Sequence, residues 1–168
     1  MIMNEVSLRA LEPEDLDVLY RIENDRELWD VGVTNVPYSR YLLHNYISQA
    51  TGDIYADGQV RLMIEHKGTV VGIADLVNFD ARNLRAEVGL VIEASRRRQG
   101  YALDSLRQLA SYAQQVLHLH QLYAIIGEDN SSAIALFEKA GYKKTAEMPE
   151  WLFDGHSYRS AFLLQKIL

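Results

Sequence analysis

The sequence predicts a mixed α/β fold in which a mixed, mostly antiparallel sheet carries helices on both faces. Residues 59–92 contain three strand patterns in a row, joined by short polar turns. Residues 102–140 contain two helix patterns separated by one apolar strand pattern. With the flanking segments, the predicted order is β-α-α-β-β-β-α-β-α-β-β. The chain has 168 residues, three prolines and no internal repeat, so we expect a single domain over residues 1–168.

The N-terminal third is predicted to hold one strand and two helices. Val6–Ala10 alternates apolar and polar residues, as a short strand does. A helix should begin at Pro13, because proline is tolerated in a first helical turn, and should end near Asn24. Tyr38–Ala50 follows Pro37 and forms the second helical candidate.

The middle of the chain predicts an antiparallel meander. Tyr55–Gly58 is expected to be a turn, followed by strands at Gln59–Glu65, Thr69–Phe79 and Arg85–Ile92. His66-Lys67-Gly68 supplies the first tight turn, and β-branched residues enrich the second strand. These three strands should therefore pair in sequence.

The C-terminal part changes period. Apolar residues recur at helical spacing from Ala102 to Leu117, an apolar strand pattern covers Gln121–Gly127, and Asn130–Ala140 reads as a helix that Gly141 stops. Two final strands are expected around Lys143–Phe153 and His156–Lys166, joined at the hairpin dipeptide Asp154-Gly155.

Composition narrows the function classes. The chain has 17 basic and 23 acidic residues, a net charge of −6, which argues against a nucleic-acid partner. It has no cysteine, no apolar run that could span a bilayer and no signal-peptide pattern, so we expect a cytoplasmic protein without a membrane partner. His118-x-His120 has no carboxylate between its two imidazoles, and we expect no metal site there.

The charge is unevenly distributed along the chain. Residues 1–60 hold eleven acidic and four basic residues, whereas residues 61–168 hold twelve acidic and thirteen basic ones. This asymmetry fits a protein that attracts a cation with its first third and holds an anion in its middle. A solvated acidic surface beside an unrelated basic turn is the alternative explanation.

The most informative segment is the junction between the strand that ends at Ile92 and the helix that follows. It reads Arg96-Arg97-Arg98-Gln99-Gly100-Tyr101-Ala102. The first amides of a helix have no partner inside the helix and bind anions, and nearby guanidinium groups strengthen such a site. A pyrophosphate would fit here, although neither a P-loop nor a dinucleotide fingerprint is present. A capped helix beside a basic surface turn remains the alternative.

Two motifs resemble those of a known family. Arg97-x-x-Gly100-x-Ala102 is similar to the acetyl-CoA pyrophosphate motif of the GNAT N-acetyltransferase superfamily. About thirty residues later, the segment from Asn130 to Tyr142 resembles that family's second cofactor motif. The segment from Asp75 to Leu90 is most similar to the branch that holds ribosomal-protein N-terminal acetyltransferases and spermidine N-acetyltransferases.

The resemblance implies acetyl-CoA as cosubstrate and a set of binding residues for it. The backbone of Leu90, Val91 and Ile92 would pair with the pantetheine arm as an added strand would. Asn130 would hydrogen-bond the arm from the second helix, and Phe137 would lie against the cofactor. The pyrophosphate would be held by the junction residues Arg97, Arg98, Gln99, Gly100, Tyr101 and Ala102.

The implied reaction is acetyl transfer to a primary amine, either a protein N-terminus or a small amine such as a polyamine, by direct attack in a ternary complex. The amine must lose a proton, and Glu87 is the candidate catalytic residue, as the sole carboxylate between Asp80 and Glu93. A backbone N–H near Leu90 or Val91 would polarise the carbonyl. Alternatively, Glu87 is only the partner of Arg85 or of a residue on a neighbouring strand.

Substrate contacts are expected from Glu27 and Trp29, where an acidic aromatic loop could hold a cationic amine. A solvated loop over a buried tryptophan is the alternative for this segment. The resembled branch often forms dimers, which makes a homodimer an expectation for this chain.

Two hydroxyls that occur in many relatives are missing, because Phe137 and Ala133 stand where those proteins carry tyrosine and serine. In those relatives the tyrosine is the acid expected to protonate the leaving thiolate. Tyr101, Tyr123 or Tyr158 could take over that role here. An acetyl-CoA-binding sensor with little catalysis is the alternative function.

Overall fold

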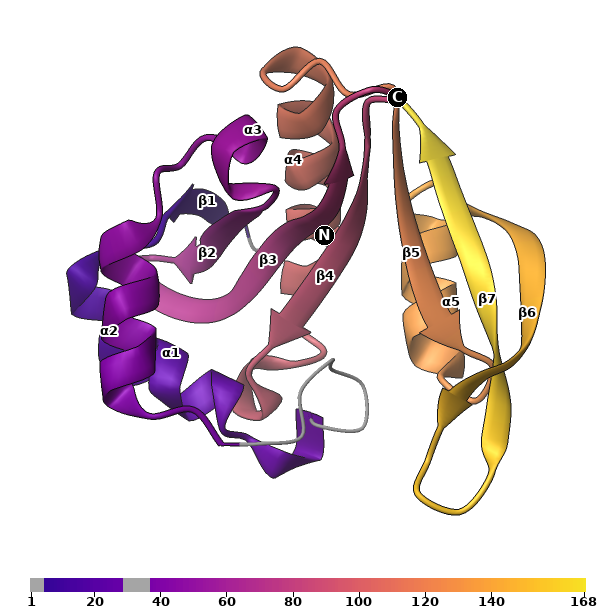
Figure 1. Ribbon diagram of the computed structural model, residues 1–168, viewed down its shortest axis with the longest axis horizontal. Coiled ribbons are helices and arrows are strands. Elements are labelled where there is room, and N and C mark those ends of the chain that lie inside the picture. The colour runs from indigo at the N-terminus through magenta and orange to yellow at the C-terminus, as the bar shows by residue number, and fades with distance from the viewer. Residues whose placement is uncertain (1–4, 29–36) are drawn as a thin grey trace.

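A seven-stranded sheet forms the centre of the molecule in the computed structural model, which describes residues 5–28 and 37–168. The strand order is β1-β2-β3-β4-β5-β7-β6, and every neighbouring pair is antiparallel except β4 and β5. Figure 1 shows the strands, whose bounds are β1 Ser7–Ala10, β2 Val60–His66, β3 Thr69–Asp80, β4 Arg85–Ile92, β5 Gln121–Gly127, β6 Lys143–Phe153 and β7 Tyr158–Ile167. The predicted mixed, mostly antiparallel sheet is confirmed.

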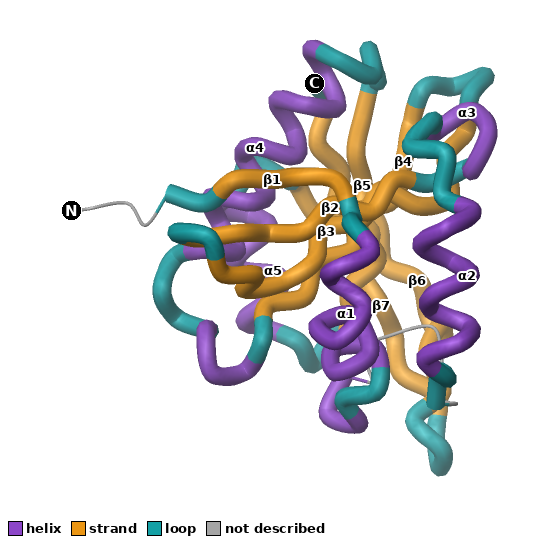
Figure 2. Tube along the Cα trace, turned by 90° about the vertical axis from the view of Figure 1, so that its left-hand side faces the viewer, coloured by secondary structure: helices purple, strands orange, loops and turns teal. Residues whose placement is uncertain are grey.

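Helices cover both faces of this sheet, as predicted (Figure 2). One face carries α4 and α5 and the other carries α1 and α2. The α-helices are α1 Leu16–Glu23, α2 Arg40–Gln49, α3 Ile54–Asp57, α4 Tyr101–Gln115 and α5 Ser131–Lys139, and short 3-10 helices form at Pro13–Asp15, Arg26–Leu28 and Ala94–Arg96.

One local prediction was wrong. Residues 55–58 were expected to be a simple turn, but Ile54–Asp57 forms the short helix α3. The Asp53 side chain accepts a hydrogen bond from the Tyr55 amide at 2.9 Å and caps its start. Gly58 ends it in the left-handed conformation, with φ at 68°. Ile54 is buried, so the helix is kept by a core contact that local sequence does not reveal.

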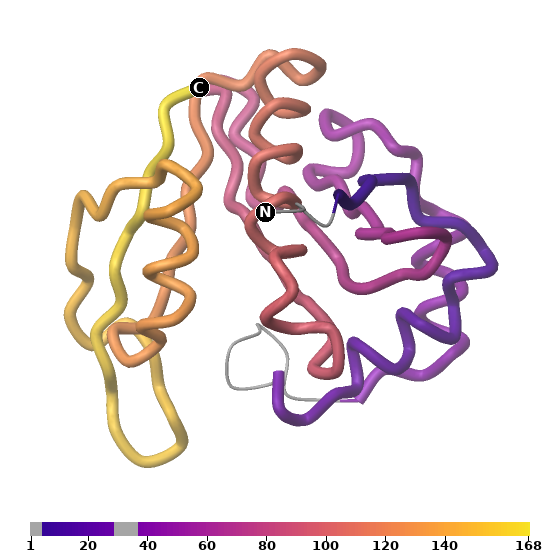
Figure 3. The backbone as a smooth tube through the Cα atoms, turned by 180° about the vertical axis from the view of Figure 1, so that it is seen from behind, coloured from indigo at the N-terminus to yellow at the C-terminus, as the bar shows by residue number. Residues whose placement is uncertain are grey.

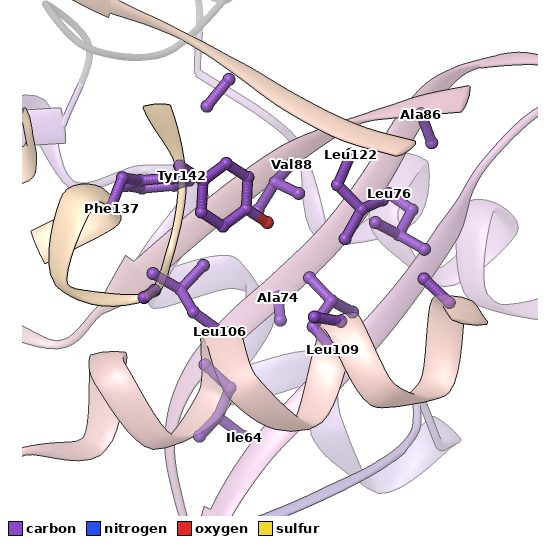
Figure 4. Close-up of a cluster of buried hydrophobic side chains, with 14 of the residues drawn as sticks. Ile64, Ala74, Leu76, Ala86, Val88, Leu106, Leu109, Leu122, Phe137 and Tyr142 are labelled. Atoms are coloured by element: carbon purple, nitrogen blue, oxygen red, sulfur yellow. The ribbon is translucent and has the colours of Figure 1, made fainter. Parts of the chain in front are cut away.

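Two hydrophobic clusters hold the helices against the sheet. The larger one lies between the sheet and α4 and α5, and includes Leu76, Val88, Leu106 and Phe137 (Figure 4). The smaller one lies on the opposite face, where α1 and α2 pack on β2 and β3. Because successive strand residues point to opposite faces, β4 contributes Val88 to the larger cluster and Val91 to the smaller one.

An ion pair with a buried carboxylate fixes the corner between β1 and α1. Both terminal nitrogens of Arg9 donate to Asp15 at 2.8 Å, and the Arg9 Nε atom donates to Glu65 at 2.7 Å. Asp15 is 5% exposed and also accepts the Glu12 amide hydrogen bond at 2.8 Å. The Arg9 guanidinium therefore holds the pKa of Asp15 below its usual value.

The β6–β7 hairpin extends beyond the rest of the sheet, as Figure 1 shows. Trp151, Phe153 and Tyr158 are all more than half exposed there. Within the described part of the chain, no helix has the length and apolar character needed to cross a membrane.

Candidate functional site

The central feature of the site is a fork in the sheet between β4 and β5. These two strands pair only where Arg85–Glu87 lies beside Gln121–Tyr123. Beyond that point β4 stays paired with β3 as far as Ile92, and β5 stays paired with β7 as far as Gly127. Figures 1 and 3 show the two strands diverging toward the end at which α4 begins. Among the described residues, Val88–Ile92 therefore has a strand partner on one edge only.

The hydrogen-bonding alternation of β4 identifies which backbone groups face the fork. The Glu93 amide donates to the Val71 carbonyl at 2.9 Å, so residue 93 faces β3. In an antiparallel pair these groups alternate, and the N–H and C=O groups of Val88, Leu90 and Ile92 consequently face the open edge. Of the three residues expected to pair with the pantetheine arm, Leu90 and Ile92 thus have the required direction. The backbone of Val91 points to β3 instead.

An exposed turn follows β4 and leads into α4. Its backbone adopts left-handed conformations twice, at Arg98 with φ of 62° and at Gly100 with φ of 85°. The Arg97 Nε atom donates to the Ile92 carbonyl oxygen at 3.2 Å and ties the turn to the end of the strand. Residues 94–100 are all exposed.

The start of α4 offers amides to an anion. The first hydrogen bond of the helix runs from the Asp104 amide to the Gly100 carbonyl at 3.2 Å, so the amides of residues 101–103 have no partner within the helix. A Cβ atom at Gly100 would meet no atom within 4 Å, which leaves this backbone open to close approach. The junction therefore has the features that a pyrophosphate needs.

The ring of Tyr101 is buried beneath the start of α4 rather than exposed in this turn. It packs on His66 with 5.0 Å between the ring centroids, and the Tyr101 hydroxyl donates to the Gln99 side chain at 3.1 Å. Of the six junction residues expected to bind phosphate, Tyr101 can therefore contribute its amide but not its ring.

Glu87 lies at the base of the fork, on the face that α1 and α2 cover. The Asn78 side-chain amide donates to Glu87 Oε2 at 2.7 Å. Asn78 sits at an irregularity in the β3–β4 register with φ at 50°, and the bulge turns its side chain toward Glu87. Arg85 pairs with Asp80 at 2.9 Å rather than with Glu87. One of the alternatives from the sequence is thus present, because Glu87 does have a partner on a neighbouring strand.

That hydrogen bond leaves one carboxylate oxygen of Glu87 available for proton transfer. Its Oε1 atom makes no hydrogen bond to any residue that the structure describes, and the side chain is half-buried. Tyr123 lies beside Glu87 in the β4–β5 register, and burial together with the Glu87 charge raises the pKa of Tyr123. A carboxylate and a phenol thus occupy neighbouring positions where the two strands separate.

A partly buried ionic cluster, formed by Arg61, Asp75 and Glu23, lies further along the same face. Arg61 donates to both Asp75 carboxylate oxygens at 2.8 Å and also pairs with Glu23, while its guanidinium stacks on Tyr46. Burial alone lowers the pKa of Arg61, but the two carboxylates raise it more. Two carboxylates against one guanidinium leave this cluster with a net negative charge, which favours a cationic amine.

Sequence reasoning did not find this cluster. Arg61 is separated from Glu23 by 38 positions and from Asp75 by 14, and no local spacing connects the three. The cross-strand pairing of Arg61 with Asp75 brings two of them together, and the packing of α1 on the sheet adds the third.

The structure describes only one of the two residues expected to contact substrate. Glu27 is exposed in the short helix Arg26–Leu28 that follows α1. Trp29 lies outside the residues that the structure describes. Among the described residues, no three histidine, aspartate or glutamate side chains gather as metal ligands would.

Asn130 and Phe137, which were expected to bind cofactor, both contact other residues of the protein. Asn130 caps α5, since its side-chain oxygen accepts hydrogen bonds from the Ala133 amide and the Ser132 hydroxyl, both at 3.2 Å. Phe137 is buried, and its ring meets the Tyr142 ring edge to face at 5.0 Å. Tyr142 had not been singled out from the sequence.

Comparison with known proteins gives a consistent picture. The family model described as an acetyltransferase (GNAT) domain matches residues 5–143. The chain is 26% identical over 158 residues to spermidine N(1)-acetyltransferase of Escherichia coli strain K12, covering 94% of this chain and 83% of that protein. It is 25% identical over 157 residues to the putative ribosomal N-acetyltransferase YdaF of Bacillus subtilis strain 168, covering 90% and 85%.

Solved structures share the fold. The crystal structure of spermidine N-acetyltransferase from Vibrio cholerae in complex with CoA and spermine superimposes with a TM-score of 0.86 at 22% identity, covering 97% of this chain and 95% of that one. A dodecameric structure of the Vibrio cholerae enzyme superimposes with a TM-score of 0.80 at 21% identity, covering 97% and 94%.

Proposed function

This chain belongs to the GNAT acetyltransferase family and is an N-acetyltransferase, and we propose that it transfers the acetyl group of acetyl-CoA to a primary amine by direct attack in a ternary complex. The observation that carries the proposal is the one-sided edge of β4, which runs from Glu87 at the base of the fork to the anion-binding turn at Gly100. This geometry can hold an extended ligand by its phosphates at one end and expose its acyl group at the other.

Each part of the site has a defined task in this proposal. The α4 amides and the arginines of the turn hold the pyrophosphate. The backbone groups of Leu90 and Ile92 pair with the pantetheine arm as a neighbouring strand would. Because the Leu90 amide faces the fork, it can also donate to the thioester carbonyl as negative charge develops on that oxygen.

Glu87 accepts the proton that the amine must lose. An amine of high pKa reaches the site as an ammonium, which has no lone pair for attack. A carboxylate at the base of the fork attracts this cation, and its Oε1 atom passes a proton on to water. Asn78 fixes the orientation of the carboxylate through Oε2.

The acceptor is proposed to be a small cationic amine such as spermidine, or a protein N-terminus. The net negative charge of Glu87 and the partly buried ionic cluster supports a cationic acceptor, and spermidine acetyltransferases are among the relatives. A homodimer is proposed as well, with the exposed aromatic side chains of the β6–β7 hairpin as the contact surface, which light scattering would test.

The test combines a turnover assay with a binding assay. Thiol release is followed with acetyl-CoA and a panel that contains spermidine, spermine and short peptides with free N-termini, while calorimetry measures CoA binding. Glu87→Gln should lower kcat/KM by about 10²-fold or more and leave CoA binding unchanged. Glu147→Gln, which changes an exposed carboxylate on β6, serves as the matched control.

The outcomes separate the candidates. Absence of CoA binding would reject the proposal outright. CoA binding with no transfer to any amine, and no effect of Glu87→Gln, would favour the sensor function, for which the missing hydroxyls at Phe137 and Ala133 are the motivating observation.

A further inference from the structure

Tyr142 carries a buried hydroxyl group that the fold does not use. The residue follows α5 directly after Gly141, and it is only 2% exposed. Its hydroxyl is fully buried and has no hydrogen-bond partner among the residues that the structure describes. Burying a hydroxyl without a partner is unfavourable, and a phenylalanine would fill the same space without that cost. The hydroxyl therefore calls for a role other than stabilising the fold.

This hydroxyl is directed at the fork. Figure 4 shows it pointing away from the Phe137 ring and toward the side chain of Val88, which belongs to the same buried cluster. Val88 is the first β4 residue beyond the pairing with β5, and its backbone groups face the open edge. An arm that ran along β4 from the turn before α4 would bring its reactive end toward this residue.

The two faces of the sheet divide the reacting groups. Glu87 and Val88 are neighbours in β4, so their side chains point to opposite faces. Glu87 lies on the face of α1 and α2, and the Tyr142 hydroxyl lies on the face of α4 and α5. An acyl group held in the fork would therefore have the carboxylate on one side and the hydroxyl on the other.

We propose that the Tyr142 hydroxyl donates a proton to the sulfur that leaves during acetyl transfer, an inference that rests on the proposed function. The amine nitrogen forms a bond to the acyl carbon and the carbon–sulfur bond breaks. The sulfur takes the proton of the Tyr142 O–H group and leaves as a thiol. Once the thiol has left, Tyr142 regains a proton from water that enters the emptied fork, and the proton lost by the amine leaves through Glu87 to solvent.

The surroundings of Tyr142 suit a proton donor to sulfur better than those of the other candidate tyrosines do. Burial raises the pKa of Tyr142, so the phenol retains its proton at neutral pH. The Tyr101 hydroxyl is already bonded to Gln99. Tyr158 is 62% exposed on the β6–β7 hairpin, and Tyr123 lies beside Glu87 at the base of the fork.

Tyr142→Phe removes only the hydroxyl and provides the test. We expect kcat for the best amine to fall at least about tenfold, somewhat below the usual 10²–10⁴ of acid–base catalysis because CoA thiolate is a tolerable leaving group. The KM for acetyl-CoA should not rise and the thermal midpoint should not fall, since no hydrogen bond is lost. Tyr112→Phe, which removes a half-buried hydroxyl that packs on the same cluster, is the matched control and should leave kcat unchanged.

A second variant tests the chemistry independently. Phe137→Tyr in the Tyr142→Phe background returns a hydroxyl to the adjoining ring, where relatives carry tyrosine, and should recover part of kcat. An unchanged kcat in Tyr142→Phe would overturn the inference while leaving the proposed function intact. A fall in thermal midpoint that accompanies the fall in kcat would also overturn it, by showing a structural role. Wild-type protein that transfers no acetyl group would overturn both.

Discussion

Replacing Gly100 with alanine should weaken CoA binding much more than it weakens the fold. Gly100 has φ of 85° and ψ of −5°, and a Cβ atom there would meet no atom within 4 Å. The cost to folding is therefore conformational alone, about 1–2 kcal/mol for a residue with a Cβ atom in the left-handed region. In a chain of this length each kcal/mol lowers the thermal midpoint by roughly 2–4 °C.

The effect on binding should be larger because the backbone at Gly100 positions the α4 amides that we propose hold phosphate. A hydrogen bond to a charged group contributes about 1.5–3 kcal/mol. At about 1.4 kcal/mol per factor of ten, loss of one such bond raises the Kd for CoA roughly 10- to 100-fold. The added methyl would also occupy the open space beside the start of α4.

Calorimetric titration with CoA, together with thermal unfolding, measures both effects. Gly58→Ala is the matched control, because Gly58 has φ of 68° and ψ of 4° and also has no atom near its added Cβ, yet it ends α3. It should lower the thermal midpoint by a similar amount and leave CoA binding unchanged. If Gly100→Ala binds CoA as wild type does, or if both variants lose affinity equally, the assignment of the phosphate turn is wrong.

Two further predictions concern the scaffold of the site. Asp15→Asn should lower the unfolding free energy by about 2–4 kcal/mol at pH 7, because it breaks the ion pair with Arg9. The Asp15 carboxylate is buried, and the one-third exposure of the Arg9 side chain keeps the cost below that of a fully buried pair. The folded pKa of Asp15 is lowered, so this stabilisation is fully present above the unfolded value of 3.8 and is lost as the pH falls through the folded value. In denaturant titrations, the difference in unfolding free energy between wild type and variant should be constant from pH 7 to about pH 5 and should disappear at lower pH. A difference that stays the same at low pH would contradict the assignment. Gly72→Ala should cost about 2–3 kcal/mol and impair CoA binding, because its Cβ would lie 2.1 Å from the Val91 carbonyl oxygen and force β3 away from β4. Gly89→Ala, whose Cβ would lie 3.4 Å from the nearest atom, is the control in unfolding measurements, and equal costs for the two variants would refute this reading of the strand contact.

Local patterns were sufficient for most of the fold. Arg85–Ile92 and Gln121–Gly127 form strands with the predicted bounds, and Asn130 and Gly141 mark the ends of α5 as expected. These features depend on residue alternation, caps and backbone preferences that act over a few positions. Residues 54–57 were missed because the helix there depends on burial of Ile54 rather than on periodicity.

The catalytic side of the site was less accessible from the sequence. Glu87 could be selected by its position along β4, but its partner Asn78 depends on a bulge in the β3–β4 register. The sequence also suggested three tyrosines as the acid, and Tyr142 was not among them. Its orientation follows from the packing of α5 against the fork, which brings together residues from distant parts of the chain.

The sequence by itself determined the order of the elements and the exposed basic turn between β4 and α4, because both arise from interactions between residues close together in the chain. Only the tertiary structure decided where β4 and β5 separate, which face Glu87 occupies and where the Tyr142 hydroxyl points. Each of these depends on strand register and helix packing between segments tens of residues apart, and no local pattern specifies such long-range contacts.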